Sequence, residues 1–142
     1  MRIIRVLPRH LDSDLLRNSG LTASDYTTMM VLSETPKREL RMSDLANANG
    51  LSASRTTRVV DSLVERGFLT KTVSASDTRG NVARLTPAGM AKLKSAWPAH
   101  LRSARNRFFD WIEACEVEAA ARALVSVAAR LEEPSGAPPA RE

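Results

Sequence analysis

The sequence predicts a mainly α-helical protein with a small β-wing: a winged helix-turn-helix flanked by a helical segment at each end. Three observations support this fold class. Residues 43–67 form two short amphipathic segments around a turn, residues 68–85 alternate like a β-hairpin, and both terminal regions carry apolar stripes at helical spacing. A length of 142 residues suffices for one core but not for two independent domains.

The first helix of the helix-turn-helix is predicted from its cap and turn residues. Ser43 is expected to be its N-cap, and Leu45 with Ala46 begins its apolar face. Asn49 and Gly50 tolerate the left-handed backbone conformation, so the helix should end there.

The second helix is expected to begin after Ser52, as its N-cap, and to end at Gly67. Its buried stripe recurs at three- and four-residue spacing and consists of Thr56, Val59, Val60 and Leu63. In a helix-turn-helix, the second helix is the one that lies in the DNA major groove.

A wing is predicted directly after this helix. Residues 68–73 and 82–85 alternate apolar and polar side chains like half-buried strands, and the turn between them is polar. Residues 39–41 are a candidate third strand. Upstream, Thr22 and Asp25 resemble a capping box for a buried helix that ends before Pro36.

Several of these pieces together resemble the MarR family of winged-helix regulators. They are Leu45-Ala46, Leu51-Ser52, residues 60–69, and Asp77-x-Arg79-Gly80 followed by Leu85-Thr86-Pro87-x-Gly89. The acid and arginine ahead of Leu-Thr-x-x-Gly are the specific part, and the order of elements fits the family from about residue 3 to 131. The resemblance implies a homodimer on double-stranded DNA, with an effector pocket between the dimerisation helices and the winged helix.

The terminal regions carry apolar stripes that we expect a small winged-helix core to leave partly uncovered. The first stripe consists of Ile3, Leu7, Leu11 and Leu15, and the last of Val117, Ala121, Leu124, Ala128 and Leu131. Between them, a helix that starts after Thr86 should continue toward Ile112, with a kink or break at Pro98. Pairing the terminal helices of two copies would bury both stripes and place two recognition helices roughly 34–36 Å apart.

The sequence therefore predicts one MarR-like domain over residues 1–133. The winged helix occupies about 22–89 and the dimerisation helices about 2–18 and 87–132. Residues 134–142, rich in proline, are expected to be a disordered tail.

Charge is distributed unevenly around a net value of +5. Residues 52–84 carry six basic and three acidic side chains, and residues 85–108 carry five basic and none acidic, whereas residues 109–133 carry two basic and six acidic. A basic centre and an acidic end suit a protein whose centre faces nucleic acid, although solvated helix faces are the plain alternative.

Seven side chains are the candidate DNA contacts: Ser52, Ser54, Arg55, Thr57, Arg58, Arg79 and Arg84. Ser52 can contact a phosphate at the helix N-terminus, and Arg55 or Arg58 can grip guanine in the major groove. The alternative is that these arginines bind only phosphate. Asp77 is expected to order the wing turn, and Arg79 to enter the minor groove.

By the family resemblance, Tyr26, Met29, Met30 and Trp97 are candidates for the effector pocket, with core packing as the alternative for each. The function expected is a ligand-responsive, homodimeric repressor acting on a palindromic operator. The alternatives are a ligand-independent activator or architectural DNA binder and, from another class, a protein-interaction module. DNA binding should weaken steeply with salt, whereas an apolar protein contact should not.

Other functions lack a signal in the sequence. No nucleophile with a base and no glycine-rich phosphate loop is visible, so we expect no catalysis and no cofactor. His10 and His100 are too few for a metal site. The single cysteine, Cys115, suits a reducing cytoplasm and is expected to pack rather than to sense oxidants. No segment reads as a signal peptide or membrane span.

Overall fold

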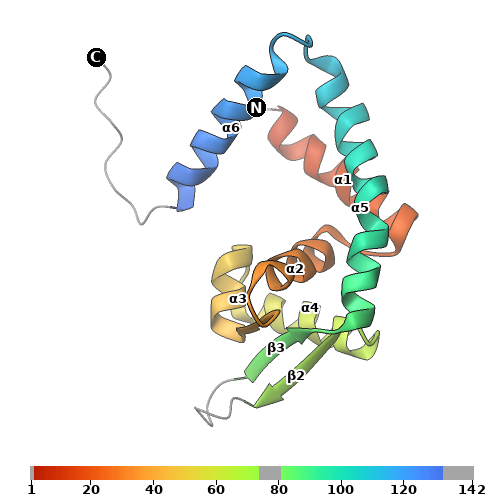
Figure 1. Ribbon diagram of the computed structural model, residues 1–142, viewed down its shortest axis with the longest axis vertical. Coiled ribbons are helices and arrows are strands. Elements are labelled where there is room, and N and C mark those ends of the chain that lie inside the picture. Colours follow the sequence, from red (N-terminus) through yellow and green to blue (C-terminus); the bar gives the residue numbers. More distant parts are fainter. Residues whose placement is uncertain (1, 74–80, 133–142) are drawn as a thin grey trace. The chain divides into compact units, whose positions relative to one another are not determined.

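The computed structural model describes residues 2–73 and 81–132 (Figure 1). Its elements, in chain order, are α1 (Arg2–Ser19), α2 (Ala23–Glu34), β1 (Glu39–Arg41), α3 (Met42–Asn49), α4 (Ala53–Glu65), β2 (Leu69–Val73), β3 (Asn81–Leu85), α5 (Pro87–Arg107), the 3-10 helix η1 (Phe109–Trp111) and α6 (Val117–Glu132). The predicted fold class, mainly α with a small sheet, is confirmed. The elements fall into two compact units, Met1–Ala104 and Arg105–Glu142. The single domain over 1–133 stays a prediction, and the predicted tail at 134–142 lies outside the described residues.

The core of the first unit lies between helices and a three-stranded antiparallel sheet. The strand order is β1-β3-β2, so β3 is central and the predicted third strand at 39–41 is confirmed as β1. The fully or nearly buried apolar side chains of this core include Leu21, Met29, Leu32, Leu45, Val60, Leu63, Leu69, Ala83 and Leu85. They come from α2, α3, α4 and the sheet. This shared core holds α4 and the hairpin strands in a defined arrangement.

A buried carboxylate connects the start of α2 with the end of α4. The Asp25 N–H donates to the Thr22 hydroxyl at 3.1 Å, and the Thr22 N–H donates to the Asp25 carboxylate at 3.0 Å, which confirms the capping box. Arg66 donates to the same carboxylate at 3.1 Å and to the Gly20 carbonyl at 2.7 Å. The buried charge is therefore paired and hydrogen-bonded, as its burial requires.

The turn of the helix-turn-helix lies where the sequence predicts it. Gly50 has φ 61° and accepts the left-handed conformation that ends α3, and the Leu51 N–H donates to the Ala46 carbonyl at 3.0 Å. The Asn49 side chain donates to the Thr28 hydroxyl at 3.1 Å, which joins this turn to α2.

The prediction for the start of this helix is wrong. Helix α3 begins at Met42, directly after β1, so Arg41 takes the N-cap position and makes no side-chain cap bond. Ser43 lies within the first turn, where its hydroxyl donates to Asp44 at 3.3 Å. Tertiary pairing of β1 with β3 sets this boundary, and a local cap preference is too weak to move it.

Helix α5 approaches the hairpin so closely that only glycine fits at its third residue. Thr86 accepts from the Gly89 N–H at 3.0 Å and donates to the Phe68 carbonyl at 3.0 Å. A Cβ atom at Gly89 would lie 2.2 Å from the Phe68 oxygen and 2.7 Å from the Leu85 side chain. The Leu-Thr-Pro-x-Gly sequence thus fixes the start of α5 against the sheet.

Pro98 does not break α5, which continues from Pro87 to Arg107. Pro98 and Lys94, one turn before it, are both exposed, so water can reach the carbonyl that loses its partner. The helix also ends earlier than the sequence predicts, because η1 begins at Phe109 instead of a continuous helix reaching Ile112.

Helix α1 lies across α5 within the first unit (Figure 1). The Ser103 hydroxyl of α5 donates to the buried carboxylate of Asp14, which also pairs with Arg17. Burial along the predicted stripe of α1 is uneven: Leu15 is 3% exposed, whereas Ile3 is 55% exposed. Within the first unit, this stripe is therefore buried at Leu15, half-buried at Leu7 and Leu11, and exposed at Ile3.

The second unit consists of the end of α5, η1 and α6. The Trp111 indole N–H donates to the Asn106 carbonyl at 3.1 Å. The Phe108 and Phe109 rings pack edge to face, with their centroids 5.1 Å apart. Along α6, Leu124 is 51% exposed, and Val125 and Val127 more so. Cys115 is exposed, so the expectation that it packs is wrong; it precedes α6 in a short connection that contributes nothing to a core.

Candidate nucleic-acid interface

Helix α4 has two faces with different roles. Its buried face consists of Thr56, Val60 and Leu63, with Val59 half-buried, as the stripe predicts. Its exposed face carries Ser54, Arg55 and Arg58 in the first two turns. In a helix-turn-helix these turns are where side chains reach base edges.

The N-terminus of α4 is capped by Ser52, as predicted. The Ser52 hydroxyl accepts from the Arg55 N–H at 3.4 Å, and its carbonyl accepts from the Thr56 N–H at 2.9 Å. The hydroxyls of Ser52 and Ser54 lie 3.3 Å apart, and both residues are exposed. Uncapped N–H groups of this turn and the positive end of the helix dipole favour an anion at this position.

The two candidate arginines differ in their surroundings. The Arg55 guanidinium donates to the hydroxyl of Ser24, in the first turn of α2, at 3.2 Å. Within residues 2–73 and 81–132, Arg58 has no hydrogen bond or ion pair. The Thr57 hydroxyl donates to the Ala53 carbonyl at 3.0 Å, and this residue is half-buried. Arg58 is therefore the side chain of this face most available to a ligand.

Among the described residues, two ion pairs involve the strands of the wing. Arg84 of β3 donates from Nε and Nη2 to one carboxylate oxygen of Glu39, its direct partner in β1. Lys71 of β2 pairs with Asp61 of α4 at 2.8 Å. Sequence reasoning proposed Arg84 as a DNA contact but missed Glu39, because the two are 45 positions apart and only the sheet register joins them. Arg79 and Asp77 lie outside the described residues.

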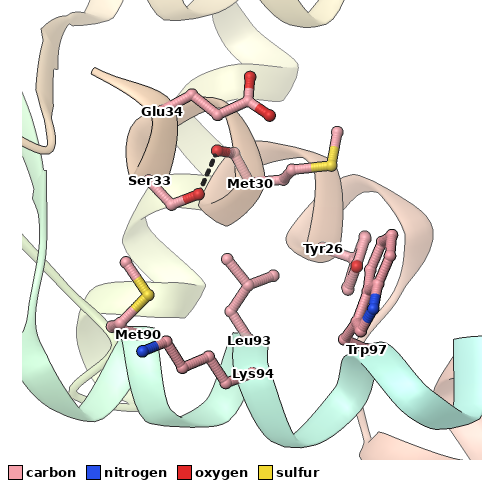
Figure 2. A pocket seen from close by; sticks show the side chains of 8 residues that line it. All are labelled: Tyr26, Met30, Ser33, Glu34, Met90, Leu93, Lys94 and Trp97. Atoms are coloured by element: carbon pink, nitrogen blue, oxygen red, sulfur yellow. Dashed lines mark hydrogen bonds between the residues drawn. The ribbon is translucent and has the colours of Figure 1, made fainter.

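A cavity of about 340 Å³ lies between α2 and α5, within the first unit (Figure 2). Its lining residues are Tyr26, Met30, Ser33 and Glu34 of α2 and Met90, Leu93, Lys94 and Trp97 of α5. Three of the four candidate pocket residues, Tyr26, Met30 and Trp97, thus line one space. Met29 does not; it is fully buried in the core, which was the alternative for it.

Two titratable rings meet beside this cavity. The centroids of the His100 and Tyr26 rings are 4.7 Å apart. The buried Nδ1 atom of His100 has no hydrogen-bond partner among the described residues. Burial lowers the pKa of His100 and raises the pKa of Tyr26. Both shifts favour uncharged rings, because burial penalises the charged form.

The features described so far define a class of protein. A capped, partly cationic second helix, a hairpin directly after it and a sheet that braces both are the parts of a winged helix-turn-helix. In the described ranges, no helix is long and apolar enough to cross a membrane.

Comparisons with known proteins identify the family. Residues 19–80 match the MarR family model. A MarR family transcriptional regulator from Streptomyces coelicolor, in complex with DNA, is 30% identical over 93% of this chain and 82% of its own, with a TM-score of 0.80. AbsC, a MarR family transcriptional regulator from the same organism, is 32% identical over 92% and 87%, with a TM-score of 0.77. BldR, a transcriptional regulator from Sulfolobus solfataricus, is 25% identical over 91% and 88%, with a TM-score of 0.75. No curated protein sequence matches the chain.

The chain belongs to the MarR family of transcriptional regulators, as its sequence motifs indicate. The resemblance to solved structures spans the terminal helices as well as the winged helix, because it covers more than nine-tenths of the chain.

Proposed function

We propose that this protein is a homodimeric transcriptional repressor that binds a palindromic operator and releases it when a small molecule binds. The observation that carries the proposal is the exposed face of α4, where Arg58 and Arg55 stand in the first two turns behind the capped N-terminus. A regulator of this kind acts on chromosomal DNA, so the proposal places it in the cytoplasm.

The DNA-binding step follows from charge and geometry. An arginine on the first turns of a recognition helix can donate two hydrogen bonds to guanine, and Ser52 at the cap can meet a phosphate. The DNA complex of the Streptomyces coelicolor relative, at 30% identity, supports the same role for this chain. Arg79, predicted at the wing tip, would add a minor-groove contact.

The homodimer follows from uncovered apolar surface. Ile3 of α1 and Leu124 of α6 are both more than half exposed, and each belongs to a regular helical stripe. A two-fold contact between copies would bury both stripes and present two recognition helices at once. Half-sites about one helical turn apart, roughly 34–36 Å, are then expected in the operator.

The ligand response follows from the cavity between α2 and α5. Its volume of about 340 Å³ suits a small molecule, and its walls combine apolar side chains with a cation, Lys94, and a carboxylate, Glu34. A ligand there would contact α2, the helix whose first turn holds Arg55 through Ser24. Release of DNA would require the ligand to bind the free state more tightly than the DNA-bound state.

The test is selection of bound duplexes from a random-sequence library with the full-length protein. A palindrome should emerge, and Arg58→Ala should lose about 1–3 kcal/mol on it and relax one base position per half-site. Arg9→Ala, which removes another exposed cation, this one from α1, is the matched control. Base readout by Arg58 is wrong if the variant weakens random and selected DNA equally.

A further inference from the structure

The ion pair between Glu39 and Arg84 is asymmetric in its exposure. The two residues lie directly opposite each other in β1 and β3, and one carboxylate oxygen accepts from Nε at 2.7 Å and from Nη2. The arginine side chain is 60% exposed and the glutamate side chain 24%. The cation is thus the outer partner, and the carboxylate holds it from the protein side.

The second pair of the wing has the opposite arrangement. In the Lys71–Asp61 pair the lysine is 24% exposed and the aspartate 50%, so the carboxylate is the outer partner. Arg84 is therefore the paired wing cation that remains open to an outside anion. A guanidinium has five N–H donors, and Glu39 occupies two of Arg84's, so donors remain for a phosphate oxygen.

We expect the Glu39–Arg84 pair to add little to the stability of the fold. Ion pairs with an exposed partner contribute little, because water screens them. The edge strand β1 is also held by the backbone, since the Leu85 N–H donates to the Arg38 carbonyl at 2.8 Å beside the paired residues. The position of the pair on the wing is more informative than its energy.

We propose that Glu39 competes with DNA phosphate for Arg84 and so restrains binding that is independent of sequence. This inference rests on the proposed DNA-binding function. A phosphate contact by Arg84 would strengthen binding to every duplex alike, because phosphates carry no sequence information. With Glu39 already neutralising Arg84, that general attraction is reduced, and a larger share of the binding free energy comes from base contacts on α4.

The test compares Glu39→Gln, Arg84→Gln and the double variant on operator and random duplexes over a range of salt concentrations. Glu39→Gln should tighten binding to both duplexes by a similar factor of roughly 3–10, and steepen the log affinity–log salt slope by about 2 per dimer. In the Arg84→Gln background, Glu39→Gln should have no effect. Glu65→Gln, which removes an exposed carboxylate of α4, controls for the change in net charge.

Each other outcome overturns the inference. Weaker binding by Glu39→Gln would mean that Glu39 positions Arg84 for DNA, and unchanged binding would mean that Arg84 does not reach phosphate. A gain that persists without Arg84, or that Glu65→Gln matches, would be a net-charge effect. Thermal unfolding verifies that each variant folds. If Glu39→Gln does not fold, Glu39→Ala, which also removes the carboxylate, replaces it with the same expected results. Absence of salt-dependent DNA binding in the unmodified protein would instead overturn the proposed function.

Discussion

The winged helix and the terminal helices have the same kind of sequence pattern but different burial. In α4, the stripe residues Val60 and Leu63 are fully buried. In α6, Leu124 belongs to an equally regular stripe and is 51% exposed. A periodic stripe therefore predicts a helix, but whether it is covered depends on the partner that the fold supplies.

The physical reason lies in how many partners one chain can offer. Each stripe of the winged helix meets another element of the same unit, and α2, α3 and α4 all face the sheet. Helix α1 is intermediate, because Leu15 joins that core and Ile3 does not. The uncovered stripes are the part of the molecule for which a second copy is proposed.

Among substitutions that test this difference in packing, the largest effect on stability is expected at Gly89, within the closely packed winged helix. Gly89→Ala places a Cβ atom against the Phe68 carbonyl oxygen, and backbone atoms cannot move aside cheaply. We expect a loss of about 3 kcal/mol in the free energy of unfolding, measured by urea denaturation. Ala91→Met, an enlargement at an exposed position of the same helix, is the control. Equal stability of both variants would contradict the tight approach of α5 to the hairpin.

On the terminal side, Leu124→Glu should weaken self-association and leave the winged helix folded. In a dimer, both copies would bury the half of the Leu124 side chain that is exposed in one chain. We therefore expect the variant to lose about 2 kcal/mol of dimerisation free energy, which is roughly a 30-fold rise in the dimer dissociation constant. Sedimentation equilibrium measures it. Ser126→Glu adds the same charge outside the stripe and should leave the dimer intact. If both variants weaken the dimer equally, the apolar stripe of α6 is not part of the interface.

A smaller effect is expected at the cap of α4. Ser52→Ala removes the acceptor for the Arg55 N–H, which should cost about 1 kcal/mol in thermal or urea unfolding. Ser43→Ala is the matched control, because Ser43 caps nothing. If the control costs as much as Ser52→Ala, the difference between the two serines is not one of capping.

The smallest effect concerns pH. Burial lowers the pKa of His100 in the folded chain, so the unfolded chain binds the proton more readily. The contribution of uncharged His100 to the free energy of unfolding should therefore be fully present above the pKa of His100 in the unfolded chain, about 6.5. It should be lost as the pH falls through the lower pKa of His100 in the folded chain. His100→Gln should flatten the profile of melting temperature against pH in this range. His10→Gln, at an exposed position of α1, is the control, and an unchanged slope in His100→Gln would refute the assignment.

Much of the winged helix could be predicted because its signals are local. The capping box of Thr22 and Asp25, the left-handed Gly50 and the cap at Ser52 each depend on neighbours within a few residues. Where a tertiary contact competes, local reasoning fails. Ser43 is not the N-cap of α3, because the pairing of β1 with β3 sets where that helix begins. Solvent exposure has a similar effect at Pro98, where α5 continues without the break that was one of the two expected outcomes.

The candidate site divides in the same way. Ser54, Arg55 and Arg58 could be placed on the exposed face of α4 from the spacing of its buried stripe, since helical geometry relates every position to every other. Spacing could not predict that Arg55 donates to Ser24. Nor could it predict that Met29 lies in the core whereas Tyr26 and Trp97 line the cavity.

The sequence by itself determined the helices, the hairpin and the family, because periodicity, caps and short motifs act over a few residues. Only the tertiary structure decided which charges are paired. Arg55, Arg58 and Arg84 are the same residue type, yet one meets a hydroxyl, one has no partner within the described residues and one meets a carboxylate. Those partners come from segments more than thirty positions away, Ser24 for Arg55 and Glu39 for Arg84, and sheet register and helix packing alone bring them within hydrogen-bonding distance.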